Sequence, residues 1–343
     1  MANPPLDSFD LKAVDYKGLI NEDVMQKIYD ISVIPLPLTD RIGTDKCRNS
    51  YKEWTVDDLG APNVANAVVD GSDATGDDNM VGERVGNHCQ ISVKQLNVST
   101  RARASDTIGR SDELSYQVMR GQQRVKRDVE AIMLTGQASN ADGGSASTTP
   151  GHSAGLAAWL KTNVDLGAGG AITGFAGGIV VKQTLGTKRA ISETSVRKVA
   201  EKVYLSNGDP TVIMSTPSAL ARLSEYMFTS SARIASQVRD TGKEAKAATA
   251  IGSVNKIVLD NDMVLDFVPN RLQQTETGGL SNVFIIQPSM LSLGLLAGYR
   301  TEPLSKTGLS DKRQVSVDWT LIVKNEKSCG LVGDIDGTAP GVL

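Results

Sequence analysis

The chain has 343 residues, of which 40% are apolar and 22% are charged, and this balance predicts one large or two ordinary globular domains rather than a disordered chain. Its 36 lysines and arginines against 39 aspartates and glutamates leave a formal net charge of −3, which excludes a polybasic surface for nucleic acid or anionic lipid. Cys47, Cys89 and Cys329 are far apart in the sequence and indicate reduced thiols. Only two isolated histidines are present, so no metal or cofactor site is predicted.

The N-terminal segment, residues 1–47, predicts an extended arm. It mixes short apolar groups with prolines, as in VIPLPLTDR at residues 33–41, and contains no long periodic element. Its first residues, MANPPLDSFDLKAVDY, lack the basic and apolar regions of a signal peptide. No apolar run in the chain approaches the roughly 20 residues that span a bilayer. We therefore expect a protein that is neither exported nor embedded in a membrane.

Residues 48–100 predict a long hairpin. The strand-like stretches YKEWTV (51–56) and QISVKQLNV (90–98) flank a polar span whose tip reads VVDGSDATGDDN (68–79). A two-stranded hairpin is marginally stable alone, so we expect it to contact a partner. The tip aspartates, whose spacing does not match a calcium loop, either meet a basic patch or cation on that partner or keep the tip soluble; they are Asp70, Asp73, Asp77 and Asp78.

Residues 111–136 predict the longest helix of the chain. Apolar residues recur there at helical spacing, with Ser111 as the expected N-cap and Gly136 as the expected stop. Arg120, Arg124 and Arg127 share another face of this helix. Acidic residues on the same helix balance its basic ones, which favours a solvated or salt-bridged face over a phosphate-binding one; these acids are Asp112, Glu113, Asp128 and Glu130.

The pentapeptide GHSAG at residues 151–155 matches the Gly-x-Ser-x-Gly nucleophile elbow of serine hydrolases, with Ser153 at the nucleophile position. The elbow requires a preceding strand, whereas residues 138–150 read ASNADGGSASTTP and predict a loop. It also requires a histidine base after the serine, and none follows; His88 lies upstream and His152 is inside the motif. The match therefore predicts no catalytic site. LGAGGAITGFAGG (166–178) lacks a phosphate-loop ending and predicts a flexible loop.

From residue 191 onward the pattern is α/β. A short helix is expected before it, at 153–163. The next expected helix has one apolar side, formed by Val196, Val199, Ala200, Val203 and Tyr204. A turn at 207–210 and a strand at 211–214 follow this helix. Thr216 is the expected N-cap of the next helix. A loop or frayed helix is expected at 233–250, and strands at 256–259 and 263–268 flank a turn at 260–262.

The sequence RQVSVDWTLIVKN at residues 313–325 predicts a long strand with one buried face. Val315, Val317, Trp319, Leu321 and Val323 alternate with more polar residues, and Trp319 is expected to be a core residue. This strand is able to return the chain to the long helix.

This order of elements resembles the major capsid proteins of tailed bacteriophages, which have the Hong Kong 97-type fold also used by herpesvirus capsid floors and encapsulin shells. The resemblance covers nearly the whole chain, and SLGLLAGYRTEPLSKTGLSDKRQVSVDWTLIVKNEKS (292–328) is its most characteristic part. It implies an α+β fold with an N-terminal arm (1–47), an extended loop formed by the long hairpin (48–100), a peripheral domain (101–190) with its spine helix (111–136), an α/β axial domain (191–298) and a return to the peripheral domain (299–343).

The resemblance also implies the function. A major capsid protein assembles as pentamers and hexamers into the icosahedral shell that encloses double-stranded DNA without sequence-specific binding, in the host cytoplasm, and then forms part of the virion. Scaffolding, portal and decoration proteins are its expected partners. The absence of a long scaffolding region leaves a separate scaffolding protein or a removed leader as alternatives, and Met1 favours the former. The tip aspartates and the three helix arginines are the candidate inter-subunit contacts. An encapsulin-like compartment is the alternative function, and a hydrolase through Ser153 is the second.

Overall fold

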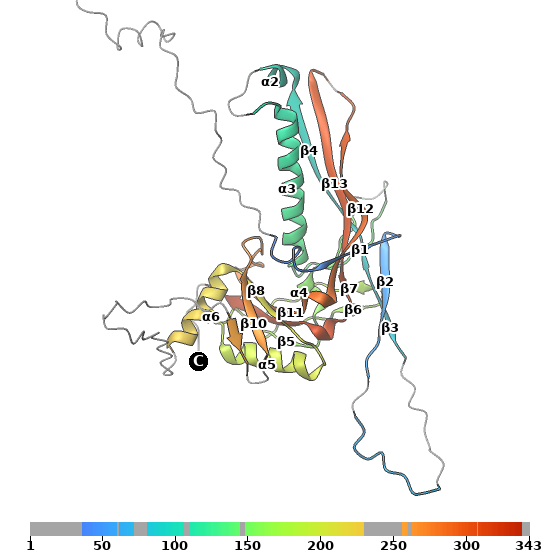
Figure 1. Cartoon of the computed structure of the whole chain (residues 1–343), viewed down its shortest axis with the longest axis vertical. Coiled ribbons are helices and arrows are strands. Elements are labelled where there is room, and N and C mark those ends of the chain that lie inside the picture. Colours follow the sequence, from blue (N-terminus) through green and yellow to red (C-terminus); the bar gives the residue numbers. More distant parts are fainter. Residues whose placement is uncertain are drawn as a thin grey trace, which may run out of the picture.

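The computed structural model describes residues 36–59, 62–71, 81–105, 110–144, 148–229, 256–259, 263–306 and 308–337, with side chains of the last helical residues before 230 excepted. A long limb, which holds the longest helix and a four-stranded sheet, rises from a broader region that holds a six-stranded sheet (Figure 1). Most of the predicted arm (1–35), the predicted loop at 233–250 and the predicted turn at 260–262 lie outside the described residues.

The limb is built on a four-stranded sheet in the order β1 (Gly43–Lys46), β12 (Leu291–Pro303), β13 (Ser310–Val323) and β4 (Gln90–Ser99). β12 and β13 are long antiparallel neighbours, and β13 also pairs antiparallel with β4 from Ser310↔Ser99 to Trp319↔Gln90. The long strand predicted at 313–325 is therefore confirmed as β13, and Trp319 is fully buried, as predicted. The short helix α2 (Thr100–Ala104) follows β4 at the far end of the limb.

Helix α3 (Glu113–Met133) packs along β4 and β13 and confirms the predicted long helix (Figure 1). Gly121 continues its buried stripe because a Cβ there would lie 2.8 Å from Leu96 Cδ1 of β4. The predicted caps are wrong. Asp112 is the N-cap, since its carboxylate accepts a hydrogen bond from Leu114 N at 3.2 Å, and the helix ends at Met133, before Gly136.

The second sheet has six strands in the order β5 (Val164–Asp165), β14 (Gly330–Asp336), β11 (Leu280–Ile286), β8 (Val212–Ser215), β10 (Val264–Pro269) and β9 (Lys256–Val258). Strands β8, β9 and β10 confirm the predicted strands, and β9 and β10 pair antiparallel. Helices α5 (Glu193–Leu205) and α6 (Pro217–Thr229) confirm the predicted helices. Tyr204 is 53% exposed, so its predicted place on the buried side of α5 is wrong, although its neighbour Val203 is fully buried there.

The chain crosses between the two sheets twice in its last third. After β11, the short helix η1 (Pro288–Met290) directs it into β12 and β13 of the limb, and η2 (Glu326–Ser328) directs it back into β14 beside β11. Residues 299–343, expected to return to the peripheral domain, thus contribute β13 to the limb and β14 to the six-stranded sheet.

A hairpin of β2 (Tyr51–Val56) and β3 (Glu83–His88) extends away from both sheets (Figure 1). The first strand is as predicted, but the second is not residues 90–98, which form β4 and pair with β13. The hairpin is therefore shorter at its base, because β3 is the partner of β2. The helix predicted at 153–163 is reduced to the four residues of α4 (Leu156–Trp159), and two short strands, β6 (Phe175–Ala176) and β7 (Ile179–Val180), follow it.

Candidate functional site

Ser153 has a structural role in a buried hydrogen-bond network. The pairing of β4 with β13 ends at Trp319↔Gln90, and beyond that point the backbone of Leu321 is satisfied by side chains. Leu321 N donates to Ser153 Oγ at 3.1 Å, and Asn87 Nδ2 donates to Leu321 O at 2.8 Å and to Ser153 Oγ at 3.2 Å. These two side chains therefore take the place of a strand partner.

This network is closed to solvent and does not include an imidazole. Ser153 and Asn87 are fully buried. Among the hydrogen bonds of the described residues, the partners of the Ser153 hydroxyl are Asn87, Thr320 and Leu321. His88 instead lies ring against ring with Tyr51, with centroids 4.5 Å apart. Ser153 therefore holds β13 in place through its hydrogen bonds. Among the described residues, its hydroxyl has no histidine as a hydrogen-bond partner to act as the base that a serine nucleophile needs.

The base of the hairpin is fixed to the body by aromatic side chains of β2. Tyr51 Oη donates a hydrogen bond to Gly178 O at 2.8 Å, and Trp54 Nε1 donates one to Val323 O at 3.0 Å. The Trp54 ring also lies 5.4 Å from that of Trp159. Burial raises the pKa of Tyr51 and lowers that of His88, so both groups favour their neutral forms and the contact stays uncharged at neutral pH.

The chain between β2 and β3 leaves the body without covering its own apolar side chains. Its described residues are exposed throughout. The large aliphatic side chains among them are mostly or fully exposed: Leu59 (88%), Val64 (100%), Val68 (70%), Val69 (78%) and Val81 (91%). Scattered exposed aliphatics are normal on a protein surface, but these five are gathered on one projecting segment. A projecting segment that exposes this many aliphatic side chains is a candidate for contact with another molecule.

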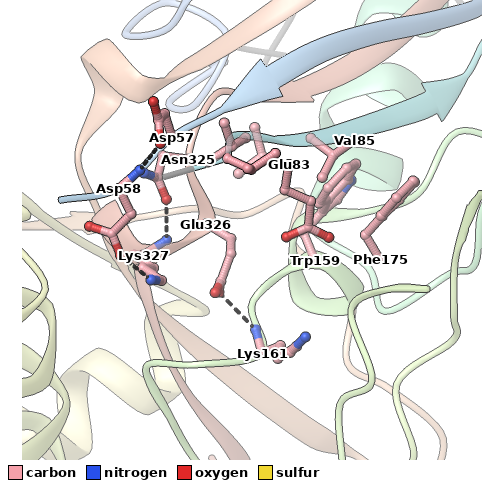
Figure 2. A pocket seen from close by; sticks show the side chains of 13 residues that line it. Asp57, Asp58, Glu83, Val85, Trp159, Lys161, Phe175, Asn325, Glu326 and Lys327 are labelled. Atoms are coloured by element: carbon pink, nitrogen blue, oxygen red, sulfur yellow. Dashed lines mark hydrogen bonds and ion pairs between the residues drawn. The ribbon is translucent and has the colours of Figure 1, made fainter. Parts of the chain in front are cut away.

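Figure 2 shows a pocket of about 230 Å³ where the hairpin joins the body. Trp159 and Phe175, whose rings stack 6.1 Å apart, form an apolar wall with Val85. Opposite them lie charged side chains of the hairpin and of η2, including Asp58, which pairs with Lys327. Trp159 Nε1 is buried and has no hydrogen-bond partner among the described residues. The pocket thus joins an apolar wall and a charged rim.

A second uncovered apolar surface lies on the limb. Ile91 and Val93 of β4 are exposed, whereas Leu96 and Val98 are buried. Odd and even residues of a strand point to opposite faces, so Ile91 and Val93 lie on the face away from α3. The limb therefore presents apolar side chains on the sheet face that its own helix does not cover.

The predicted site residues are spread over the hairpin and α3. Asp70 is exposed on the described part of the hairpin, whereas Asp73, Asp77 and Asp78 lie outside the described residues. On α3, Arg124 and Arg127 are exposed and Arg120 is partly buried.

Among the described residues, the acids of α3 do not form ion pairs with Arg124 or Arg127. Asp112 and Glu113 instead pair with Arg103 and Arg110, and Asp128 pairs with Lys94 of β4 at 2.7 Å. Three of the four acids counted against the arginines in the sequence are therefore engaged with other cations, and Arg124 and Arg127 present their charge at the surface.

Glu130 is the residue that the sequence did not single out. It is fully buried and accepts hydrogen bonds from Leu38 N at 2.7 Å, Thr39 N at 2.9 Å and Asn270 Nδ2 at 2.8 Å. The Glu130 carboxylate thereby connects helix α3 to the end of the arm and to the residue after β10. Its neighbour Tyr299 has its pKa raised to about 12, mainly by burial and also by the charge of Glu130.

The part of the chain that the structure describes contains no group of three or more metal-binding side chains arranged to hold a metal ion. Over the same residues, none of the helices combines the length and apolar character needed to cross a membrane.

Comparisons with known proteins give the same result by sequence and by structure. A family model described as the SU10 major capsid protein matches residues 8–336. The major capsid protein of Escherichia phage Phieco32 is 32% identical over 102 residues, which span 30% of this chain and 29% of the length of that relative.

The similar solved structures cover almost the whole chain. That of Mycobacterium phage Adephagia has a TM-score of 0.56 and 13% identity over 98% of this chain and 100% of its own. The capsid of a native GTA particle has a TM-score of 0.59 and 10% identity, with 94% and 97% covered. The holo-SrpI encapsulin complex of Synechococcus elongatus PCC 7942 has a TM-score of 0.54 and 13% identity, with 99% of each chain covered. These likenesses confirm the α+β, Hong Kong 97-type fold predicted from the sequence.

Proposed function

Because the chain belongs to the family of SU10 major capsid proteins, we propose that its copies assemble as pentamers and hexamers into an icosahedral shell that encloses the double-stranded DNA of a tailed phage. The observation that carries the proposal is the projecting hairpin with its five exposed aliphatic side chains. Burial of one such side chain contributes about 1.5–3 kcal/mol, so a neighbouring copy that covers them gains a large part of the free energy needed for a stable contact.

The two sheets correspond to the two domains that we propose for the subunit. In our proposal the six-stranded sheet with α5 and α6 forms the axial domain, and the four-stranded sheet with α3 forms the peripheral domain. The hairpin is the extended loop, and it reaches the next subunit of the same capsomer. Contacts of this kind between different surfaces of identical chains close into rings when the rotation allows.

Charged residues on these elements supply candidate contacts between copies. Arg124 and Arg127 present positive charge on α3 because the acids of that helix are engaged elsewhere. Asp70 and the other three tip aspartates are the acidic partners that we propose for them. Opposite charges on two surfaces speed their encounter and fix their register more than they add affinity.

An encapsulin-like compartment is the alternative, since a structure of that class shares the fold. The family match and the curated relative favour the phage shell. Within our proposal, assembly takes place in the host cytoplasm, and scaffolding, portal and decoration proteins are the candidate partners. Particles isolated from producing cells distinguish the alternatives, because a phage shell protects DNA from nuclease and an encapsulin holds a cargo protein.

Assembly of the purified chain tests the role of the hairpin. We expect the wild type to form uniform closed particles in electron micrographs and in sedimentation velocity. A Val64→Asp/Val68→Asp variant places two charges in the proposed contact and loses two buried side chains, so the concentration needed for assembly should rise by about a hundredfold or more, since each 1.4 kcal/mol is a factor of ten.

Val258→Asp is the matched control. Val258 is an exposed valine on the edge strand β9 of the six-stranded sheet, away from the hairpin, and the control should assemble as the wild type does. Equal assembly of the hairpin variant and the control would overturn the proposed role of the hairpin. A wild-type chain that stays a monomer at high concentration, alone and with scaffolding protein, would overturn the shell itself.

A further inference from the structure

Two cysteines flank the hairpin at its base. Cys47 directly follows β1, and its N–H donates to Leu295 O of β12 at 2.9 Å. Cys89 lies between β3 and β4, and its N–H donates to Ser50 O at 2.7 Å. The hairpin therefore leaves the four-stranded sheet after one cysteine and re-enters it at the other.

The two thiols belong to one small buried cluster, which they form with Ile322 of β13. Cys47 is 1% exposed and Cys89 is 8% exposed. The Cys89 Sγ also lies 3.6 Å from Asn49 O, so the cover over this cysteine is the short connection at residues 48–50. That connection is itself exposed, and its opening is a small local event.

The thiols also interact with each other, and the interaction makes them unequal. A hydrogen bond from Cys89 lowers the pKa of Cys47, with a further contribution from the charge of Lys52. The same contact, together with burial, raises the pKa of Cys89. Cys47 is consequently the better thiolate of the pair, and the thiolate is the nucleophile in disulfide exchange.

Cys329 is the natural reference within the same chain. It is fully buried in a different core cluster, beside Leu331 of β14, and burial raises its pKa. No second cysteine belongs to its cluster among the described residues, so Cys329 is expected to stay reduced.

We propose that Cys47 and Cys89 are a modification site at which an intrachain disulfide closes the base of the hairpin. A small-molecule disulfide such as oxidised glutathione is the oxidant. The Cys47 thiolate attacks one of its sulfurs, a bond to Cys47 Sγ forms, and one glutathione thiolate leaves and takes up a proton. Cys89, as thiolate, then attacks Cys47 Sγ and releases the second glutathione. Two protein thiols are oxidised and one glutathione disulfide is reduced to two thiols.

The bond would constrain the unfolded chain by closing a loop that contains the whole hairpin, and disulfides that close long loops stabilise most in the chain-entropy description. The reducing interior of a cell keeps such thiols reduced, whereas a particle outside the cell meets oxidising conditions. Only this choice of setting rests on the proposed shell function. The bond itself is tested on unassembled chain, so its failure and that of the shell proposal are separate results.

Peptide mapping tests the site directly. The purified wild-type chain is incubated with oxidised glutathione under native conditions, its remaining thiols are alkylated in denaturant, and the product is digested with trypsin. Cleavage after Lys46, Arg48, Arg84 and Lys94 releases residues 47–48 and 85–94. We expect these two peptides joined, with the summed mass less that of two hydrogen atoms, and Cys329 alkylated.

Serine variants provide the controls. Cys47→Ser and Cys89→Ser should each lose the joined peptide, and Cys329→Ser should keep it. The urea midpoint of oxidised wild-type chain should lie above that of the reduced chain, and this comparison does not depend on how well a variant folds. Three alkylated cysteines after oxidation would overturn the proposal. A glutathione adduct that stays on Cys47 or Cys89, or a link to Cys329 or to a second chain, would overturn it equally.

Discussion

Glu130 connects three segments of the subunit through one buried carboxylate, and its removal is expected to weaken the fold strongly. Leu38 and Thr39 donate to it from the end of the arm, and Asn270 donates from the segment after β10. Glu130→Ala leaves all of these donors without their acceptor. The change therefore loosens the arm and the six-stranded sheet from α3 together.

The size of the effect follows from which donors water is able to reach. Leu38 is 1% exposed and Asn270 is fully buried, so neither donor finds a solvent partner easily. A buried donor without an acceptor costs about 1–3 kcal/mol, and the two together about 2–6 kcal/mol. Loss of the buried charge recovers part of its desolvation cost. The expected net loss is about 3 kcal/mol of unfolding free energy.

Urea unfolding of the unassembled chain, followed by tryptophan fluorescence, measures this loss. Asp128→Ala is the control on the same helix, because Asp128 pairs with Lys94 where both side chains are 43% exposed. Such pairs contribute about 0–1 kcal/mol. Trypsin cleavage after Arg41 should also accelerate in Glu130→Ala and not in the control. Equal unfolding free energies and equal cleavage rates for the two variants would refute the reasoning.

Ser153→Ala should cost about 1–3 kcal/mol of unfolding free energy, because the buried N–H of Leu321 loses its acceptor; a loss too small to detect in urea unfolding would contradict the structural role of this serine. Lys306 and Arg103 lower the pKa of Asp311, so this carboxylate stabilises the fold above its unfolded pKa, and the contribution is lost as the pH falls through the lower folded pKa. Asp311→Asn should flatten the acid side of the plot of melting temperature against pH, and an unchanged acid side would argue against the pairing.

The elements that the sequence predicts well are those whose periodicity results from a single buried face. Helix α3 presents Leu114, Val125 and Val129 to the sheet at helical spacing, and each is buried. The exact ends of α3 were not predictable in the same way. Ser111 and Asp112 are both good N-cap residues, and only the geometry of the preceding chain decides between them.

The hairpin shows why pairing is harder to predict than strand formation. Residues 90–98 alternate because one face of β4 lies under α3, and alternation does not say which strand is the partner. Strand β3 is hidden by its own sequence, ERVGNH, which has few residues with strand preference. Gly86 is required there because a Cβ would lie 2.6 Å from Cζ of Tyr51 on the paired strand. The Tyr51 ring, which fixes the hairpin to the body, thus requires a glycine in β3, and that glycine weakens the strand pattern of β3 in the sequence.

Strand β14 is hidden for a related reason. Its sequence GLVGDID is buried along nearly its whole length, so it lacks alternation. Gly330 leaves room for Val199 and Val203 of α5, and a Cβ at Gly333 would lie 2.6 Å from Leu166 Cδ2. Glycines that weaken a strand pattern in the sequence are here the condition for close packing on both faces of the sheet.

Polar residues in the sequence predict exposure wrongly when their side chains satisfy backbone groups inside the fold. The alternation in β13 predicts one buried face, yet Ser316, Thr320 and Ile322 of the other face are buried too. Thr320 Oγ1 donates to His88 O at 2.9 Å, where the hairpin ends. Glu130 follows the same logic, since its donors come from segments far away in the sequence. A polar side chain on a strand or helix therefore predicts exposure only if no other segment needs its hydrogen bonds. In this chain those segments include the end of the arm, the residue after β10 and the base of the hairpin.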